Sequence, residues 1–302
     1  MKIKPLCILA LLPVLTSLPV SSALAQSAEI IQVVAVAEDN AEQRINLSGK
    51  LRMLSQRIPA AACHLDRGID ADGSLALLTG ATAEFDQILN ALEFGDLGVN
   101  IQAAETRRKT LQRIHILGDL WEPFKQAAAA VAEGRATEAE VRYLMTENTE
   151  VLANAQRLVE ELTKQYANPM ATTRASLMLV DISGRQRMLT QRMSKESCMI
   201  GTAYETPQTV EGLAQTRQIF TASLEALQFG LQSVGVLPPP NNEIATGLAG
   251  VKEDWQKVAP YVADIVAGES IDDADRTHMF QGLNVTMANM NRVVGMYADA
   301  AK

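Results

Sequence analysis

Hydrophobic residues recur along this chain every three to four positions, and the strict alternation typical of β-strands is nearly absent. Alanine, leucine, glutamate, glutamine and methionine, all good helix formers, dominate the composition. Stretches containing glycine and proline interrupt the pattern at regular points and divide it into amphipathic segments. The pattern therefore predicts eight helices, at 40–67, 74–94, 101–133 and 137–167, followed by 172–203, 208–229, 242–267 and 271–300.

The second half of the chain repeats the first at a fixed offset. The segment Gly49–Arg57 (GKLRMLSQR) returns 135 residues later as Gly184–Arg192 (GRQRMLTQR), and Cys63 maps onto Cys198. A constant offset over such a span indicates an internal duplication. Short connections between long helices favour antiparallel neighbours, so each half is predicted to be a four-helix bundle. The predicted fold is all-α, with two tandem antiparallel four-helix bundles at 27–167 and 168–302.

The junction between the two halves leaves two arrangements open. Asn168 precedes Pro169, and a residue before proline avoids the helical conformation, so we expect the chain to break there. Thr172 or Thr173 can then cap the next helix. In the alternative arrangement, one helix runs through this point with a kink at Pro169, and the bundles stack end to end instead of side by side.

The first helix of each bundle has two faces of different character. At 100° per residue, the core face of the first copy carries only leucine and isoleucine (Leu47, Leu51, Leu54 and Ile58). A second face is small and polar, with one arginine at its centre. The candidate ligand-binding residues on this face are Gly49, Arg52, Ser55 and Gln56, and in the second copy Gly184, Arg187, Thr190 and Gln191.

Arg52 and Arg187 are the strongest binding candidates. A guanidinium is always charged, and its fork of donors suits planar or tetrahedral oxyanions. Four helices return the chain to its starting end, so the first helices of the two halves run parallel. If they pack side by side, the two arginines meet, and a small anion between them relieves their repulsion. In the alternative interpretation, each arginine pairs with a carboxylate of its own bundle and binds no ligand.

Two of the three cysteines, Cys63 and Cys198, fit the same geometry, and the third, Cys7, lies in the N-terminal segment that resembles a secretory signal. Cys63 follows Arg52 by 11 residues, which places it only about 20° away around the helix. The same relation holds for Cys198 and Arg187. Packing of the two first helices side by side would therefore bring the cysteines together, and we hypothesise a disulfide between the repeats. Two separate buried thiols are the alternative.

The first 26 residues resemble a secretory signal, with Lys2 and Lys4 ahead of an apolar stretch and Ala23-Leu24-Ala25 as the cleavage site. We therefore expect export to the periplasm, with an uncleaved inner-membrane anchor as the alternative. No later apolar run is long enough for a transmembrane segment. Removing both lysines changes the net charge from −8 to −10, and such an acidic chain is a poor nucleic-acid binder.

Nothing in the sequence predicts an enzyme, a metal site or a cofactor. His64, His115 and His278 are scattered, without the paired spacing that metal ligation on a helix requires. No phosphate-binding loop or nucleophile motif stands out. We therefore expect a protein that binds rather than catalyses.

Asn46–Arg57 and Asp181–Arg192 resemble the first helix of the periplasmic sensor domain of nitrate/nitrite sensor kinases, which also begins the type IV pilus methyl-accepting transducers. The resemblance extends over essentially the whole mature chain, as two copies. It implies an antiparallel four-helix bundle that dimerises through its first helix, with one nitrate held at the two-fold axis between paired arginines and close to a glycine. By motif match, those residues are Arg52, Gly49, Arg187 and Gly184.

The chain also departs from those sensors, because no transmembrane helix or signalling region follows the second bundle before Lys302. We therefore expect it to pass its signal to a separate membrane-bound sensor or transducer. The expected function is binding or sensing of a small oxyanion, with nitrate or nitrite as candidates, between the first helices of the two repeats. The alternative is a structural or adaptor protein of helical bundles without a small-molecule ligand.

Overall fold

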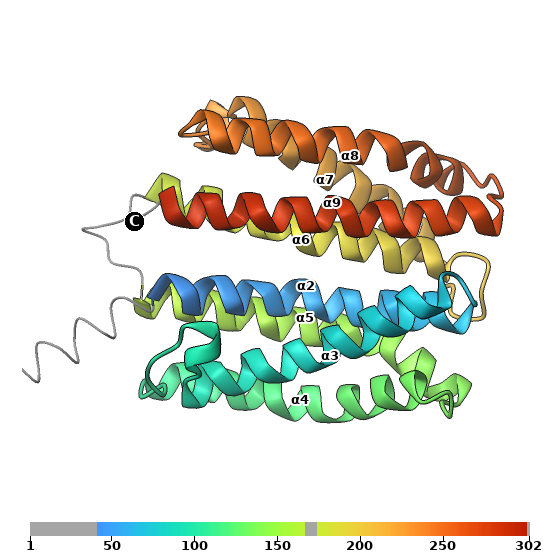
Figure 1. Cartoon of the computed structure of the whole chain (residues 1–302), viewed down its shortest axis with the longest axis horizontal. Helices are drawn as coiled ribbons and strands as arrows, with labels where there is room; N and C mark the ends of the chain where they lie inside the picture. Colours follow the sequence, from blue (N-terminus) through green and yellow to red (C-terminus); the bar gives the residue numbers. More distant parts are fainter. Residues whose placement is uncertain (1–40, 167–173, 301–302) are drawn as a thin grey trace, which may run out of the picture.

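A computed structural model describes residues 41–166 and 174–300 as helices joined by short loops (Figure 1). The first repeat contains α2 (Ala41–Asp66), α3 (Ala71–Phe94), α4 (Arg108–Ala132) and α5 (Glu138–Tyr166). The second contains α6 (Arg174–Met199), α7 (Thr209–Phe229), α8 (Asn242–Val266) and α9 (Asp273–Ala300). The predicted all-α class with two four-helix bundles is confirmed. The predicted signal sequence and the junction at Pro169 lie outside the described residues.

The two bundles lie side by side, with α2 and α6 at the centre (Figure 1). Helix α2 packs against α3 and α5 of its own bundle and against α6, while α6 packs against α7 and α9. The two central helices run parallel, because contacts between them join positions about 135 residues apart, such as Cys63 with Cys198. The end-to-end arrangement is therefore not the one adopted.

Each bundle has its own apolar core, and the predicted core face of α2 lies in the first. Leu51, Leu54 and Ile58 are fully buried, and Leu47 is nearly so. In the second core, Phe220 packs edge-on against Trp255, at the positions where Phe85 stacks on Trp121 in the first. The helical period of the sequence thus places a phenylalanine–tryptophan pair in both cores. None of the described helices is both long and apolar enough to cross a bilayer.

Helix α4 begins at Arg108, later than the predicted residue 101. The preceding residues form a backbone bridge instead, in which the Asp96 and Ile101 N–H groups each donate to the other residue's carbonyl. Ile101 is fully buried in this loop, so in the sequence its hydrophobic position resembles the first turn of the following helix. The other predicted boundaries agree within four residues.

Candidate functional site

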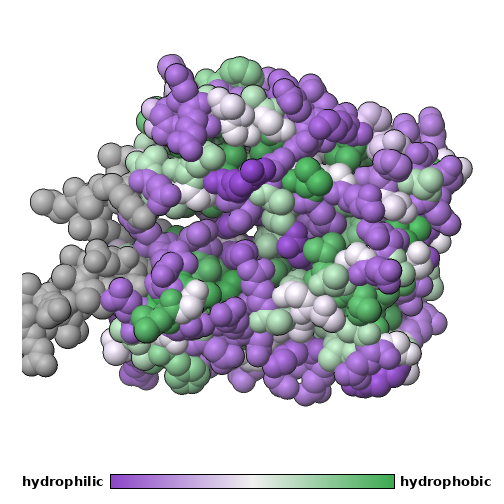
Figure 2. All heavy atoms as spheres, in the orientation of Figure 1, coloured by the Kyte–Doolittle hydropathy of each residue, from purple (hydrophilic) through white to green (hydrophobic). Residues whose placement is uncertain are grey.

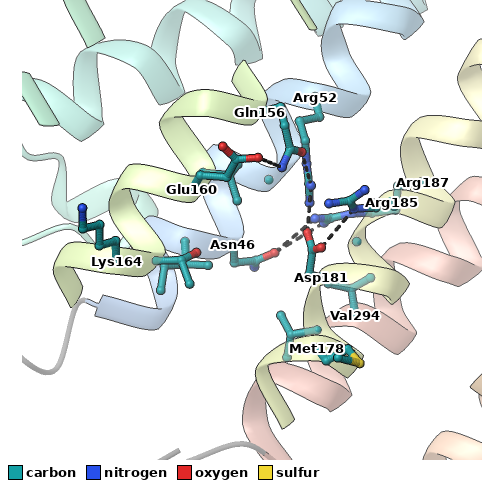
Figure 3. Close-up of a pocket in the computed structure, with 16 residues that line it drawn as sticks. Asn46, Arg52, Gln156, Glu160, Lys164, Met178, Asp181, Arg185, Arg187 and Val294 are labelled. Carbon is teal, nitrogen blue, oxygen red and sulfur yellow. Dashed lines mark hydrogen bonds and ion pairs between the residues drawn. The ribbon is translucent and has the colours of Figure 1, made fainter. Parts of the chain in front are cut away.

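Arg52 on α2 and Arg187 on α6 converge at the interface between the two bundles (Figure 3). A Cβ atom at Gly49 would lie 3.4 Å from Arg52 Nη2 and 3.5 Å from Arg187 Nη2. At Gly184 the corresponding distances are 3.2 and 3.7 Å. The two glycines thus leave room for both guanidinium groups against the helix backbones. Only 3% of Arg52 and 2% of Arg187 is exposed, so both charges are buried.

The partners of Arg52 come from both repeats. Its Nη1 donates to Asp181 Oδ1 at 2.8 Å and to Gln156 Oε1 at 2.7 Å. Asp181 lies on α6, so the carboxylate that pairs with Arg52 belongs to the other bundle and not to its own. Asp181 is shared, because Arg185 Nε also donates to its second oxygen at 3.0 Å.

Arg187 has a different environment, made of neutral groups. Its Nη1 donates to Asn291 Oδ1 at 2.7 Å, and both terminal nitrogens lie 3.4 Å from Asn46 Oδ1. Within the described ranges, no carboxylate lies at ion-pair distance from this guanidinium. Asn46 occupies the repeat position of Asp181, and Asn291 that of Gln156. The two half-sites are therefore equivalent in position but unequal in charge.

The burial of two like charges shows in their pKa values. Burial, with a smaller contribution from the nearby Arg52, lowers the pKa of Arg187 to about 9. Burial also lowers the pKa of Arg52, but Asp181 acts in the opposite direction. The Nε atom of each arginine is buried without a hydrogen-bond partner in the described part of the chain. The cluster therefore carries more buried positive charge than its single carboxylate neutralises.

A cavity of about 490 Å³ adjoins the two arginines and both glycines. The surface is hollowed between the two bundles, toward the end where α2 begins (Figure 2). Away from the arginines, the lining is largely apolar, and the exposed Glu160 and Lys164 stand at the rim. The apolar lining residues are Ile45, Val159, Met178, Val180 and Val294.

The family model for the N-terminal domain of type IV pili methyl-accepting chemotaxis transducers matches the chain twice, at residues 34–146 and 171–278. The two matches together span well over half of the chain. The chain belongs to this family. Membership indicates a sensing or transducer-related role, and the domain of this family is a non-catalytic signalling domain. A search of curated proteins found no match.

Four of the expected ligand-binding residues of this tandem transducer-type domain do not line the cavity. The Ser55 hydroxyl donates to the Arg52 carbonyl, and the Thr190 hydroxyl to the Arg187 carbonyl, both at 2.8 Å. Gln191 Nε2 donates to Asn284 at 3.2 Å, and Gln56 forms part of a separate polar cluster. The two hydroxyls thus bond within their own helices and the two amides bond elsewhere in the interface. Of the eight expected residues, the two arginines and the two glycines are the ones that line the cavity.

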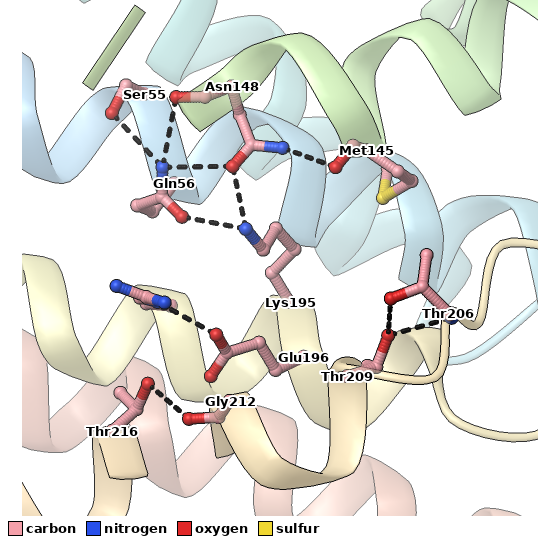
Figure 4. Close-up of polar contacts among 11 residues, drawn as sticks. Ser55, Gln56, Met145, Asn148, Lys195, Glu196, Thr206, Thr209, Gly212 and Thr216 are labelled. Carbon is pink, nitrogen blue, oxygen red and sulfur yellow. Dashed lines mark hydrogen bonds and ion pairs between the residues drawn. The ribbon is translucent and has the colours of Figure 1, made fainter. Parts of the chain in front are cut away.

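A buried lysine at the interface was not predicted from the sequence. Lys195 Nζ donates to Gln56 Oε1 at 3.0 Å and to Asn148 Oδ1 at 2.6 Å, which ties α6 to α2 and α5 (Figure 4). Burial lowers the pKa of Lys195 to about 8. Its repeat equivalent is Ala60, so the duplication could not reveal it. This cluster follows the arginines along α6 and links the second bundle to the first.

At the far end of the interface, Cys63 and Cys198 form a disulfide between α2 and α6. Arg67 Nη1 reinforces the same contact by donating to the carbonyls of Cys198 and Ile200, at 2.9 and 3.0 Å. The tandem domains are thus joined covalently at one end of the central helix pair. Toward the other end of this pair, the two arginines face each other.

Proposed function

We propose that this protein binds a small oxyanion between Arg52 and Arg187 and passes the signal to a separate membrane-bound sensor or transducer. Nitrate and nitrite are the simplest candidates, because a planar monoanion matches the guanidinium forks. The proposal places the mature chain in the periplasm, after removal of residues 1–26. The family supplies the sensing role, and the ligand and its location are our proposal.

The observation that carries this proposal is the unbalanced charge at the interface. Two guanidinium groups converge there, but Asp181 is the one carboxylate that contacts either of them among the described residues. Like charges about 4 to 6 Å apart repel by a few kcal/mol at an effective dielectric constant near 20. An anion between them removes this repulsion and gains charge-assisted hydrogen bonds from both sides.

Such binding suggests how a signal could arise. Each arginine belongs to a different bundle, so an anion that contacts both draws α2 and α6 toward each other. Binding therefore favours one spacing or angle of the two bundles over others. A membrane partner that contacts both bundles would detect that change.

Thermal melting with nitrate, nitrite, sulfate, phosphate and chloride tests the proposal. We expect one of these anions to raise the melting temperature selectively, and Arg187→Ala to abolish the rise. Arg192→Ala is the matched control, because Arg192 lies on the same helix but pairs with Glu196 outside the cavity. If no anion acts selectively, the structural or adaptor function replaces the sensing function.

A further inference from the structure

The cavity beside the arginines is much larger than an inorganic oxyanion. Its volume is about 490 Å³, which falls in the range of pockets that hold organic ligands. A four-atom anion fills a space on the order of one or two water molecules, each of which takes about 30 Å³ in the liquid. An anion bound to Arg52 and Arg187 would therefore leave most of the cavity to be filled by something else.

The remaining wall is apolar and follows the internal duplication. Ile45 and Val180 are repeat equivalents, and so are Val159 and Val294. Val159 and Val294 are 5% and 1% exposed, so they form a fixed wall of the cavity. Met178 extends this wall on the α6 side (Figure 3). A pocket that combines an apolar wall with a few convergent polar groups typically binds a ligand with an apolar body and a polar head.

The buried charges of the site match a ligand head that carries a single negative charge. The buried arginines exceed their carboxylate partner by one charge, because Asp181 already pairs with Arg52. Along α5, Glu160 lies between Gln156, which contacts Arg52, and Lys164 at the rim. Arg185, which also lines the cavity, already pairs with Asp181. A second carboxylate on the ligand would therefore have to pass Glu160 to reach Lys164, and the two negative charges would repel.

We infer that the ligand of this cavity is a monocarboxylate with a short aliphatic or aromatic body, an inference that rests on the proposed anion site. Its carboxylate lies between the forks of Arg52 and Arg187, where two coplanar oxygens accept from two guanidinium groups. Its apolar body packs against the valine pair and Met178. The inorganic anions then bind as fragments of this ligand, through the head-group contacts alone.

Calorimetric titration of the full mature protein with acetate, butyrate, hexanoate and benzoate tests the inference, with nitrate, hexanol and adipate as comparisons. We expect affinity to rise from acetate to hexanoate by up to about fourfold per methylene group, the value for full burial of a CH₂. Hexanol, which lacks the charge, should bind at least tenfold more weakly than hexanoate. Adipate, with its second charge, should also bind more weakly.

Two variants locate the binding. Met178→Gln carries the residue that the first repeat has at the equivalent position, Gln43. We expect it to lower hexanoate affinity several-fold while acetate affinity stays unchanged, because only the apolar body contacts Met178. Arg187→Met should abolish binding of both carboxylates. The chain-length series on the unmodified protein keeps the test valid even if Arg187→Met fails to fold.

The outcomes separate this inference from the proposed function. If nitrate binds but affinity does not rise with chain length, the organic ligand is excluded and the anion site stands. If hexanol binds as tightly as hexanoate, or adipate binds more tightly, the monocarboxylate class is wrong. If no anion binds at all, whether inorganic or organic, the proposed function itself falls.

Discussion

Arg52 and Arg187 occupy the same position of the same motif, yet they face different neighbours. Arg52 pairs with Asp181, whereas Arg187 faces Asn46, the repeat equivalent of that aspartate. In a symmetric dimer of single domains, every substitution appears on both sides of the axis. Here the duplication allowed one half-site to change alone. The comparison shows that two halves with nearly the same structure can differ in charge: one arginine has a carboxylate partner, and the other has only amide partners.

The largest expected effect concerns the link that keeps the two halves in register. The Cys63–Cys198 disulfide closes a loop of 135 residues. Replacing both cysteines by serine should lower the free energy of unfolding by about 2 to 5 kcal/mol, because the unfolded chain gains entropy. Denaturant unfolding measures this loss. A reducing agent should destabilise the unmodified protein but leave the double variant unchanged, and an equal response from both would contradict the prediction.

The second effect concerns a position where the repeats differ, His64 against Met199. Burial lowers the pKa of His64 to about 3, and Arg67 and Arg276 contribute to the same shift. Between pH 6.5 and 3, the unfolded chain therefore binds a proton that the folded protein does not, so stability falls as the pH falls. At pH 5 the loss is about 2 kcal/mol.

His64→Met, which carries the residue of the second repeat, removes this titration. Urea unfolding at pH 7.5 and pH 5 should show a loss on acidification that is smaller by about 2 kcal/mol in the variant. The side chain of methionine keeps the apolar contact with Phe280 that the imidazole makes, so the comparison isolates the proton. Parallel losses in the two proteins would show that His64 does not titrate as described.

The smallest effect tests the arginine comparison itself, with two reciprocal variants. Asn46→Asp gives each arginine a carboxylate, and we expect it to weaken anion binding by about tenfold or 1.4 kcal/mol. Asp181→Asn removes the one carboxylate and should strengthen anion binding by a similar factor. Titration with the most effective anion of the melting panel measures both. Changes in the same direction would mean that charge balance does not control the site.

The repeat offset and the helical period were enough to predict most of the fold. They placed Leu51, Leu54 and Ile58 in a core, and they led to parallel central helices on which Cys63 and Cys198 meet. These features depend on the regular geometry of one helix and on the equivalence of the two copies. Both can be read from the sequence, as the spacing of hydrophobic residues and as the constant offset between the repeats.

The partners of the arginines could not be predicted in the same way. Asp181 stands inside the repeated motif, but its partner lies on the other bundle, and Gln156 and Asn291 lie on the last helix of each repeat. Which of these residues meet depends on how far the helices rotate and slide against each other, and spacing in one sequence does not fix that. The equivalence of Gln156 with Asn291 was the available signal, since both are amides 135 residues apart.

The two guanidinium groups belong to one polypeptide chain, so dilution of the protein does not separate them. A site assembled from two chains loses its ligand when the protein concentration falls below the dissociation constant of the dimer, because the site itself disappears. In this protein the two half-sites are always present in a one-to-one ratio. If the proposed anion site is correct, the dose–response curve of the protein therefore depends on the concentration of ligand alone, and the threshold stays the same whether the protein is scarce or abundant.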